Sequence, residues 1–221
     1  MAPIKAKPQI TAWSFSRKRD YDTCPYKAKL KCIDKLKEPS SPPMERGSMI
    51  HKLGENYVLG RIKRMPKELK LFAQEFKDLK KKLVAVESEW AFDVNWNPTG
   101  WFAHDCYVRM KIDVNYGAGA FLTVIDHKTG KVTEEKDQLE LYAIGAFHKY
   151  RHIDKVQAFF WFLDQGEERF LVVHRSELAA LEKKWKKAIK PMMNDRIFAP
   201  RPGNHCRWCH FSASKAGPCK Y

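Results

Sequence analysis

Polar and apolar side chains alternate strictly along residues 107–114, the pattern of a strand with one buried face. A Gly-Ala-Gly turn at 117–119 separates this run from residues 121–128, and the two runs are predicted to form a hairpin. Residues 134–150 have helical spacing and precede an apolar strand at 155–163. A strand, a helix and a further strand in this order predict a right-handed crossover with parallel pairing.

Further elements are predicted on both sides of this region. They are a helix capped by Ser14 or Ser16 and limited by Pro25, a helix at 45–59, a basic helix at 66–83, a strand at 84–92, a strand at 169–174, and a basic helix capped by Ser176 that runs to Asn194. The order of helix, three strands, helix and strand predicts an α/β protein with a mixed sheet flanked by helices.

Two carboxylates and one ammonium are predicted to converge at the ends of the hairpin strands. Asp113 lies on the first strand, and Asp126 and Lys128 share one face of the second because they are two residues apart. Like charges at short distance repel each other unless a divalent cation lies between them. Mg²⁺ prefers carboxylate oxygens and keeps bound waters, so the pattern predicts a metal-dependent phosphodiesterase site with Lys128 orienting the attacking water.

The sequence resembles the RecB-like branch of the PD-(D/E)XK nuclease superfamily. The motifs occur in order: Gly-x-x-x-His at 47–51, Ile-Asp at 112–113, Asp-x-Lys-Thr-Gly at 126–130 and Gln-x-x-x-Tyr at 138–142. The resemblance implies a restriction-endonuclease-like core, αβββαβ, with a cysteine-bearing C-terminal extension. Two departures are present: no glycine closely precedes Asp113 in the usual way, and His127 stands where Tyr or Phe is common.

The resemblance also implies roles for individual residues. His51, Asp113 and Asp126 would bind Mg²⁺ or Mn²⁺, and Lys128 would act on the attacking water. Gln138 and Tyr142, one helical turn apart, would orient the site or the DNA backbone. The alternatives are a helix histidine hydrogen-bonded to carboxylates or solvent at position 51, and a surface Gln with a buried Tyr at 138 and 142.

Other residues are weaker candidates for binding. Glu87 and Glu89 share a strand face, and either joins the metal site or stays exposed. Trp96 or Trp101, beside a polar turn, either stacks on bases or packs in the core. The lysine face of the helix at 66–83 either follows phosphates or is only solvated.

Charge favours a polyanionic partner. The 221 residues include 41 Lys and Arg against 26 Asp and Glu, a net charge of +15, which points to DNA. No apolar run approaches the roughly 18 residues of a membrane span. The first residues lack the apolar segment of a signal peptide, so a cytoplasmic protein is expected. The resemblance to stand-alone phage-type nucleases implies a phage gene expressed in a bacterial host.

Four of the six cysteines form a split pattern, with one near the N-terminus and three near the C-terminus. They are Cys24, Cys206, Cys209 and Cys219. The pattern resembles iron–sulfur nucleases of the RecB-like branch, such as AddB and the CRISPR adaptation nuclease, which implies a [4Fe-4S] cluster. The gap before Cys219 is longer than usual, so Zn²⁺ with His205 and His210 stays open, as do unliganded thiols.

These patterns lead to one functional expectation. Residues 1–221 are predicted to form a single nuclease domain, with a flexible lead-in at 1–13, a catalytic core at 44–175 and a cysteine-rich extension at 200–221. The expected activity is that of a DNA exonuclease in recombination, repair or replication, with protein partners from these pathways. The alternatives are a DNA-binding module without catalysis and a structure-specific endonuclease.

Overall fold

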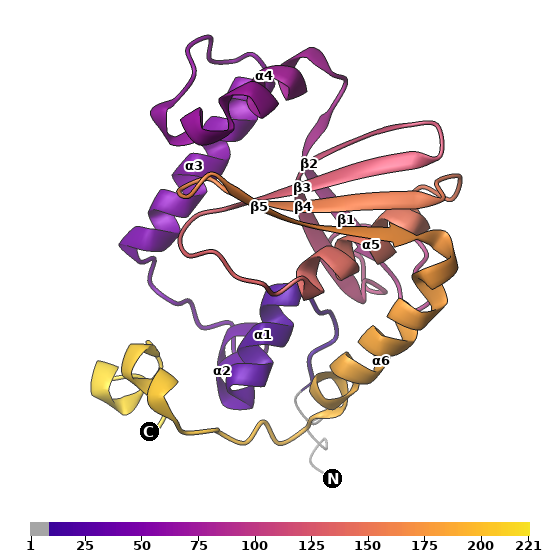
Figure 1. Ribbon diagram of the computed structural model, residues 1–221. Coiled ribbons are helices and arrows are strands. Elements are labelled where there is room, and N and C mark those ends of the chain that lie inside the picture. Colours follow the sequence, from indigo (N-terminus) through magenta and orange to yellow (C-terminus); the bar gives the residue numbers. More distant parts are fainter. Residues whose placement is uncertain (1–8) are drawn as a thin grey trace. The chain divides into compact units, whose positions relative to one another are not determined.

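Five strands form one mixed sheet in the order β1-β2-β3-β4-β5 (Figure 1). The computed structural model describes residues 9–221, and the strands are β1 Ala85–Phe92, β2 Val108–Ala118, β3 Phe121–Lys128, β4 Lys155–Phe162 and β5 Glu167–His174. Neighbouring strands are antiparallel except β3 and β4, which run parallel on either side of the crossover helix α5, Asp137–Lys149. The predicted α/β architecture with a mixed sheet and flanking helices is confirmed.

The described residues divide into two compact units. Residues 41–183, here the sheet unit, contain all five strands, and residues 9–40 with 184–221, here the terminal unit, join the two ends of the chain. Helix α6, Leu178–Asn194, passes from one unit into the other. The sequence predicts one domain over residues 1–221 with a catalytic core at 44–175, and this division stays a prediction.

Opposite faces of the sheet carry different helices (Figure 1). Helix α3, Pro42–Val58, and helix α4, Ala73–Lys81, share a buried cluster with Ile125 and Trp161 of the sheet. Helix α5 packs on the other face, where the ring of Tyr150, which follows it, meets Trp90 edge-on. Because alternate residues of a strand point to opposite faces, β3 presents Ile125 to one helical layer and Asp126 to the other.

The segment predicted as one helix at 66–83 is two elements. A 3-10 helix at Lys67–Phe72 precedes α4, and Phe72 has φ −118° and ψ 32°, which interrupts the α-helical geometry. A 3-10 helix has three residues per turn, so Leu69 and Phe72 lie on one side and are both buried. The apolar residues of this segment are therefore buried by a 3-10 helix followed by an α-helix.

Two further predictions are corrected at element ends. The last helix is not capped by Ser176, which lies inside a 3-10 turn at Arg175–Glu177; instead the Glu177 carboxylate accepts the backbone N–H of His174 at 2.7 Å. Of the predicted lead-in at 1–13, residues 1–8 lie outside the described part. Ile10 and Trp13 are buried, so the end of this segment is packed and not flexible.

The terminal unit contains α1, Phe15–Thr23, α2, Pro25–Cys32, and two short 3-10 turns at Asn204–Trp208 and Ala213–Lys215. Ser14 caps α1 by accepting the backbone N–H of Arg17, and Cys24 separates the two helices. The ring of Trp13 stacks on Trp185 with centroids 5.7 Å apart. Over residues 9–221, no helix is both long enough and apolar enough to cross a membrane.

Phe76 lies at the centre of the α3 and α4 layer and is fully buried. We expect Phe76→Ala to lower the free energy of unfolding by about 3–5 kcal/mol, because it removes apolar burial and leaves a cavity. Leu71→Ala is the control, since this side chain is 59% exposed and its loss is expected to cost less than about 1 kcal/mol. Urea denaturation measures both, and equal losses would contradict this description of the core.

Candidate active site and cysteine cluster

The regular alternation of β1 and β2 breaks at one pair of residues, Glu87 and Asp113. The register pairs Val86 with Val114 and Ser88 with Ile112, so Glu87 lies opposite Asp113. Val86 and Val114 pack in the core beneath α3 and α4. Ser88, two residues after Val86, should point to the same face, but it bonds to Asn115 on the α5 side of the sheet. Glu87 takes a φ of +50°, a left-handed conformation that costs about 1 kcal/mol or more in a non-glycine residue. Such strain is concentrated at functional sites.

This break brings three potential metal ligands together. His51 of α3 lies with Nδ1 3.2 Å from Oδ1 of Asp113, and ligand atoms of His51, Glu87 and Asp113 all lie within 4.8 Å of one another. No other group of His, Cys, Asp and Glu in the described part of the chain meets this condition. Glu87 is therefore the strand glutamate that reaches the site, whereas Glu89 is exposed.

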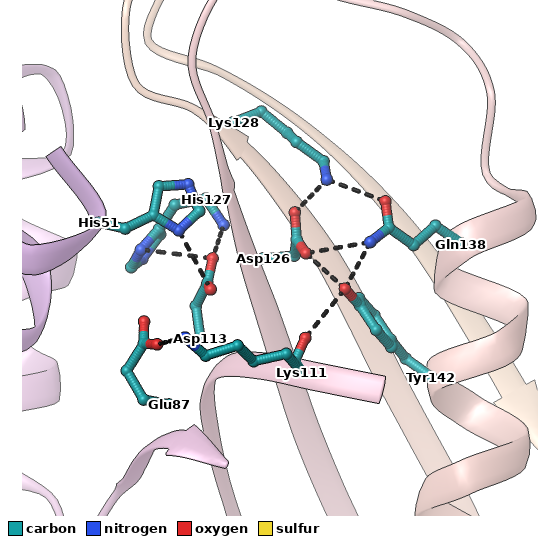
Figure 2. A network of polar contacts seen from close by, with 9 residues as sticks. All are labelled: His51, Glu87, Lys111, Asp113, Asp126, His127, Lys128, Gln138 and Tyr142. Atoms are coloured by element: carbon teal, nitrogen blue, oxygen red, sulfur yellow. Dashed lines mark hydrogen bonds and ion pairs between the residues drawn. The ribbon is translucent and has the colours of Figure 1, made fainter. Parts of the chain in front are cut away.

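The remaining predicted residues form a second group beside the first (Figure 2). Lys128 forms an ion pair with Asp126 and donates a hydrogen bond to Oε1 of Gln138 at 2.9 Å. The hydroxyl of Tyr142 lies 2.6 Å from Oδ1 of Asp126 and 2.5 Å from Nε2 of Gln138. Thus β3 supplies the acid and the lysine, and one turn of α5 supplies the two side chains that hold them.

Sequence comparison assigns the chain to a family. A model of the PD-(D/E)XK nuclease superfamily matches residues 12–214, a range that includes both groups. The chain belongs to the PD-(D/E)XK nuclease superfamily. Among curated proteins, none matches the chain.

Solved structures agree with this superfamily fold. The crystal structure of SSO0001 is 17% identical in sequence, with a TM-score of 0.50 and coverage of 100% of this chain and 90% of that chain. A crystal structure of a candidate exonuclease from Eubacterium rectale is 11% identical, with a TM-score of 0.51 and coverage of 90% and 88%. At such identities the similarity concerns the fold alone.

The two acids of the candidate site have opposite pKa shifts. Burial raises the pKa of Asp126, and the charge of Asp113 raises it further, against the opposing effect of Lys128. Burial also disfavours ionised Asp113, but its contacts with His51 and His127 outweigh this and lower its pKa. Burial and the neighbouring Asp126 hold the pKa of Tyr142 well above 10, so its hydroxyl keeps the proton that it donates to Asp126. A bound cation would favour the ionised form of both acids.

His127 lies between Asp126 and Lys128 in the sequence and packs as an aromatic side chain. Its ring centroid lies 5.2 Å from that of Phe76 and 5.9 Å from that of Trp161, and only 2% of the residue is exposed. Neither ring nitrogen has a hydrogen-bond partner among the described residues. Burial lowers the pKa of His127 to about 4, so the ring is neutral near pH 7. This explains how a histidine replaces the Tyr or Phe common in related nucleases.

An open cleft of about 1040 Å³ is lined by His51, Glu87 and Asp113. Lys111 and Gly130 also line it. Beside it, Arg46 of α3 binds Asp164 with Nη1 2.9 Å from Oδ2, and the same Oδ2 accepts the backbone N–H of Gly130 at 2.9 Å. These bonds tie α3 to the loop that follows Lys128. Because 118 residues separate Arg46 from Asp164, no local sequence pattern signals this contact.

The four predicted cysteines come together in the terminal unit, where Cys24, Cys206, Cys209 and Cys219 line one small cavity. None forms a disulfide, and Sγ of Cys24 accepts the backbone N–H of Arg201 at 3.4 Å. His205 also lines the cavity, and its buried Nε2 has no hydrogen-bond partner in the described part of the chain. By contrast, His210 is exposed.

A glycine fixes the approach of the last cysteine. A β-carbon at Gly217 would lie 2.3 Å from the backbone carbon of Phe211, which no other residue could tolerate without backbone movement. Two residues later, the N–H of Cys219 bonds to the Phe211 carbonyl at 2.9 Å. The backbone of Gly217 therefore determines where Cys219 meets the other thiols.

We expect His127→Phe to stabilise the metal-free protein, because it keeps the aromatic packing and removes two buried nitrogens that make no hydrogen bond. The gain should increase as the pH falls. His127 has a pKa of about 4 when folded and about 6.5 when unfolded. Above pH 6.5 the ring is neutral in both states and its titration costs no stability. As the pH falls from 6.5 toward 4, only the unfolded state gains the proton, so the wild-type protein loses stability. From pH 7.5 to pH 5, the advantage of the variant should grow by roughly 2 kcal/mol.

Urea denaturation in EDTA at these two pH values measures the effect. His104→Phe, a change at an exposed histidine, serves as the control and should show no comparable growth. A His127→Phe advantage that stays the same at both pH values would mean that the ring is not buried as a neutral base.

Proposed function

We propose that the protein is a Mg²⁺- or Mn²⁺-dependent deoxyribonuclease that hydrolyses phosphodiester bonds at DNA ends. The observation that carries the proposal is the proximity of His51, Glu87 and Asp113 to the paired Asp126 and Lys128. One imidazole with several carboxylates is a donor set that suits a hard or borderline divalent cation. The net charge of +15 supports DNA as the polyanionic substrate.

The residues divide the work between binding the cation and acting on the substrate. His51, Asp113 and Asp126 would hold the metal, with Glu87 as an additional ligand that the strand break presents. When bound, the metal would supply Lewis acidity toward the phosphate and lower the pKa of a water. Asp126 and Gln138 hold the Lys128 ammonium at the site, where it would orient the attacking water or stabilise charge on the phosphate.

Gln138 and Tyr142 act as positioning residues in this proposal. Tyr142 donates to one oxygen of Asp126, which leaves the other for the lysine and the cation. Gln138 accepts from Lys128 and donates toward Tyr142, so one side chain fixes both partners. Loss of either should reduce turnover without removing a reacting group.

The four ordered motifs support assignment to the RecB-like branch, and the candidate exonuclease of similar fold supports action at ends. Free DNA ends arise in recombination, repair and replication, so we place the activity in these pathways. A binding module without catalysis is a poorer account, because it would have no use for buried carboxylates that repel each other.

End-labelled linear DNA and covalently closed circles, each single- and double-stranded, test the proposal in the presence of Mg²⁺ or Mn²⁺. We expect the protein to degrade linear DNA only. Lys128→Ala should lower the rate by roughly a hundredfold or more, because the transition state loses the positive charge of the lysine ammonium. Lys149→Ala, which removes an exposed lysine at the end of α5 in the sheet unit, is the matched control and should cleave normally.

The substrates separate the alternatives. Cleavage of circles would replace the exonuclease with an endonuclease. DNA binding without cleavage under either metal would leave the non-catalytic module as the better description.

We further propose that the four cysteines bind a [4Fe-4S] cluster with a structural role. Tetrahedral zinc with sulfur ligands at about 2.3 Å would place the sulfurs about 3.8 Å apart. No three cysteine sulfurs of residues 9–221 lie within 4.8 Å of one another, which favours a larger group over a single Zn²⁺. The N–H of Arg201, which points to Sγ of Cys24, is a contact that a ligating thiolate would accept.

Gly217→Ala tests this site without changing a thiol. We expect anaerobically purified wild-type protein to show visible iron–sulfur absorbance and iron at the stoichiometry of one cluster, and the variant to lose both, because the β-carbon displaces Cys219. Gly100→Ala is the control, since its β-carbon would meet Ala103 at an ordinary 3.6 Å. Colourless wild-type protein with stoichiometric zinc would contradict the proposal.

The same preparations test the structural role. Cys209→Ser should lower the melting temperature and solubility more than the specific activity of the soluble fraction. Full stability with lost activity would instead assign the cluster to catalysis.

A further inference from the structure

Two adjacent rings at the tip of the β1 to β2 connection approach one arginine. The guanidinium carbon of Arg109 lies 5.6 Å from the ring centroid of Trp101 and 5.7 Å from that of Phe102. Phe102 is 87% exposed, so it contributes almost nothing to the core. Trp96, the other tryptophan of this connection, stacks on His148 with centroids 5.3 Å apart and is used for packing.

The connection that carries these rings is held by several hydrogen bonds. Asp93 accepts backbone N–H groups from Asn95 and Asn97, each at 2.8 Å, and Thr99 donates its hydroxyl to Asp105 at 2.8 Å. Backbone bonds at Ala103, Cys106 and Tyr107 close the remaining turns. Arg109 is fixed as well, because its Nε donates to Sγ of Cys106 at 3.3 Å. An exposed ring on such a segment is preorganised, so little order is lost when a ligand stacks on it.

The strand connects this surface to the candidate active site. Arg109, Lys111 and Asp113 alternate with the buried Met110 and Ile112, so the first three share the opposite side of β2. Lys111 lines the same cleft as Asp113. Four residues of strand place Arg109 about 14 Å from Asp113, a distance that a few nucleotides of an extended strand would cover.

We propose that Trp101, Phe102 and Arg109 form a stacking surface for unpaired bases of single-stranded DNA whose backbone leads to Asp113. The inference rests on the proposed nuclease function and specifies its substrate. Exposed aromatic rings with arginine bind bases of any sequence by stacking, and lysines follow the phosphates. The bases of a duplex already stack on their neighbours, so they offer no free face to Phe102 except at an end. The surface therefore selects a single-stranded end.

Fluorescence anisotropy of the full chain, in EDTA to prevent cleavage, tests the surface with a labelled single-stranded oligonucleotide and the corresponding blunt duplex. We expect Phe102→Ala to bind the single strand roughly tenfold more weakly, with little change for the duplex. Phe102→Tyr keeps the ring and should bind like wild type. Leu83→Ala removes a side chain that is 98% exposed in the same unit and should change neither affinity.

An abasic scan adds a readout that a general loss of affinity would not produce. Oligonucleotides that lack one base at successive positions should show one position where wild-type binding weakens, and Phe102→Ala should lose this dependence. Unchanged single-strand affinity, an equal loss for the duplex, or the same abasic profile in both proteins would each overturn the inference. Nuclease assays of the wild type separate the two proposals. If the wild type cleaves DNA and Phe102→Ala binds the single strand normally, only the stacking surface is contradicted. If the expected binding pattern is found but the wild type does not cleave, only the catalytic function is contradicted.

Discussion

The buried acidic pair Asp113 and Asp126 is the constraint on which the rest of the sheet unit depends. Both are almost fully buried, at 8% and 5% exposed, and the charge of Asp113 disfavours ionisation of Asp126. Each acid has its own partners: Asp113 has His51 and the N–H of His127, and Asp126 has Lys128 and Tyr142. Removing one partner would leave a buried charge uncompensated, at a cost of about 3–5 kcal/mol. A cation between the acids relieves the same repulsion, so the structural problem and the proposed chemistry have one solution.

The local parts of this arrangement could be predicted from the sequence. The alternation of β2 placed Asp113, the two-residue spacing joined Asp126 to Lys128, and the four-residue spacing joined Gln138 to Tyr142. These spacings hold because strands and helices have fixed periods. The parallel pairing of β3 and β4 followed from the crossover helix between them, since a strand, a helix and a strand connect in one hand.

The other parts depend on departures from periodicity or on distant contacts. Glu87 enters the site because its left-handed backbone breaks the strand pattern, and a periodic prediction gave it no advantage over Glu89. The bond between Arg46 and Asp164 joins segments with no sequence relationship. His127 shows a third limit: the sequence showed only that a histidine stands where Tyr or Phe is common, whereas burial makes its side chain a neutral ring. The type of a residue indicates which chemistry it could perform, whereas its burial decides whether it can perform it.

The topology of the chain explains how a cysteine cluster in the terminal unit would affect the sheet unit through chain connectivity. Residues 41–183 are inserted between two segments that together form the terminal unit. A bond network from Cys24 to Cys219 would close a loop that contains the whole insertion. Closing a loop of this length lowers the conformational entropy of the unfolded chain by an amount worth about 5 kcal/mol at 25 °C. Because the effect is on the unfolded state, it stabilises the whole segment between the two cysteines, including the residues of the candidate site. A cluster of this kind would therefore raise the stability available to a site that must bury two repelling acids.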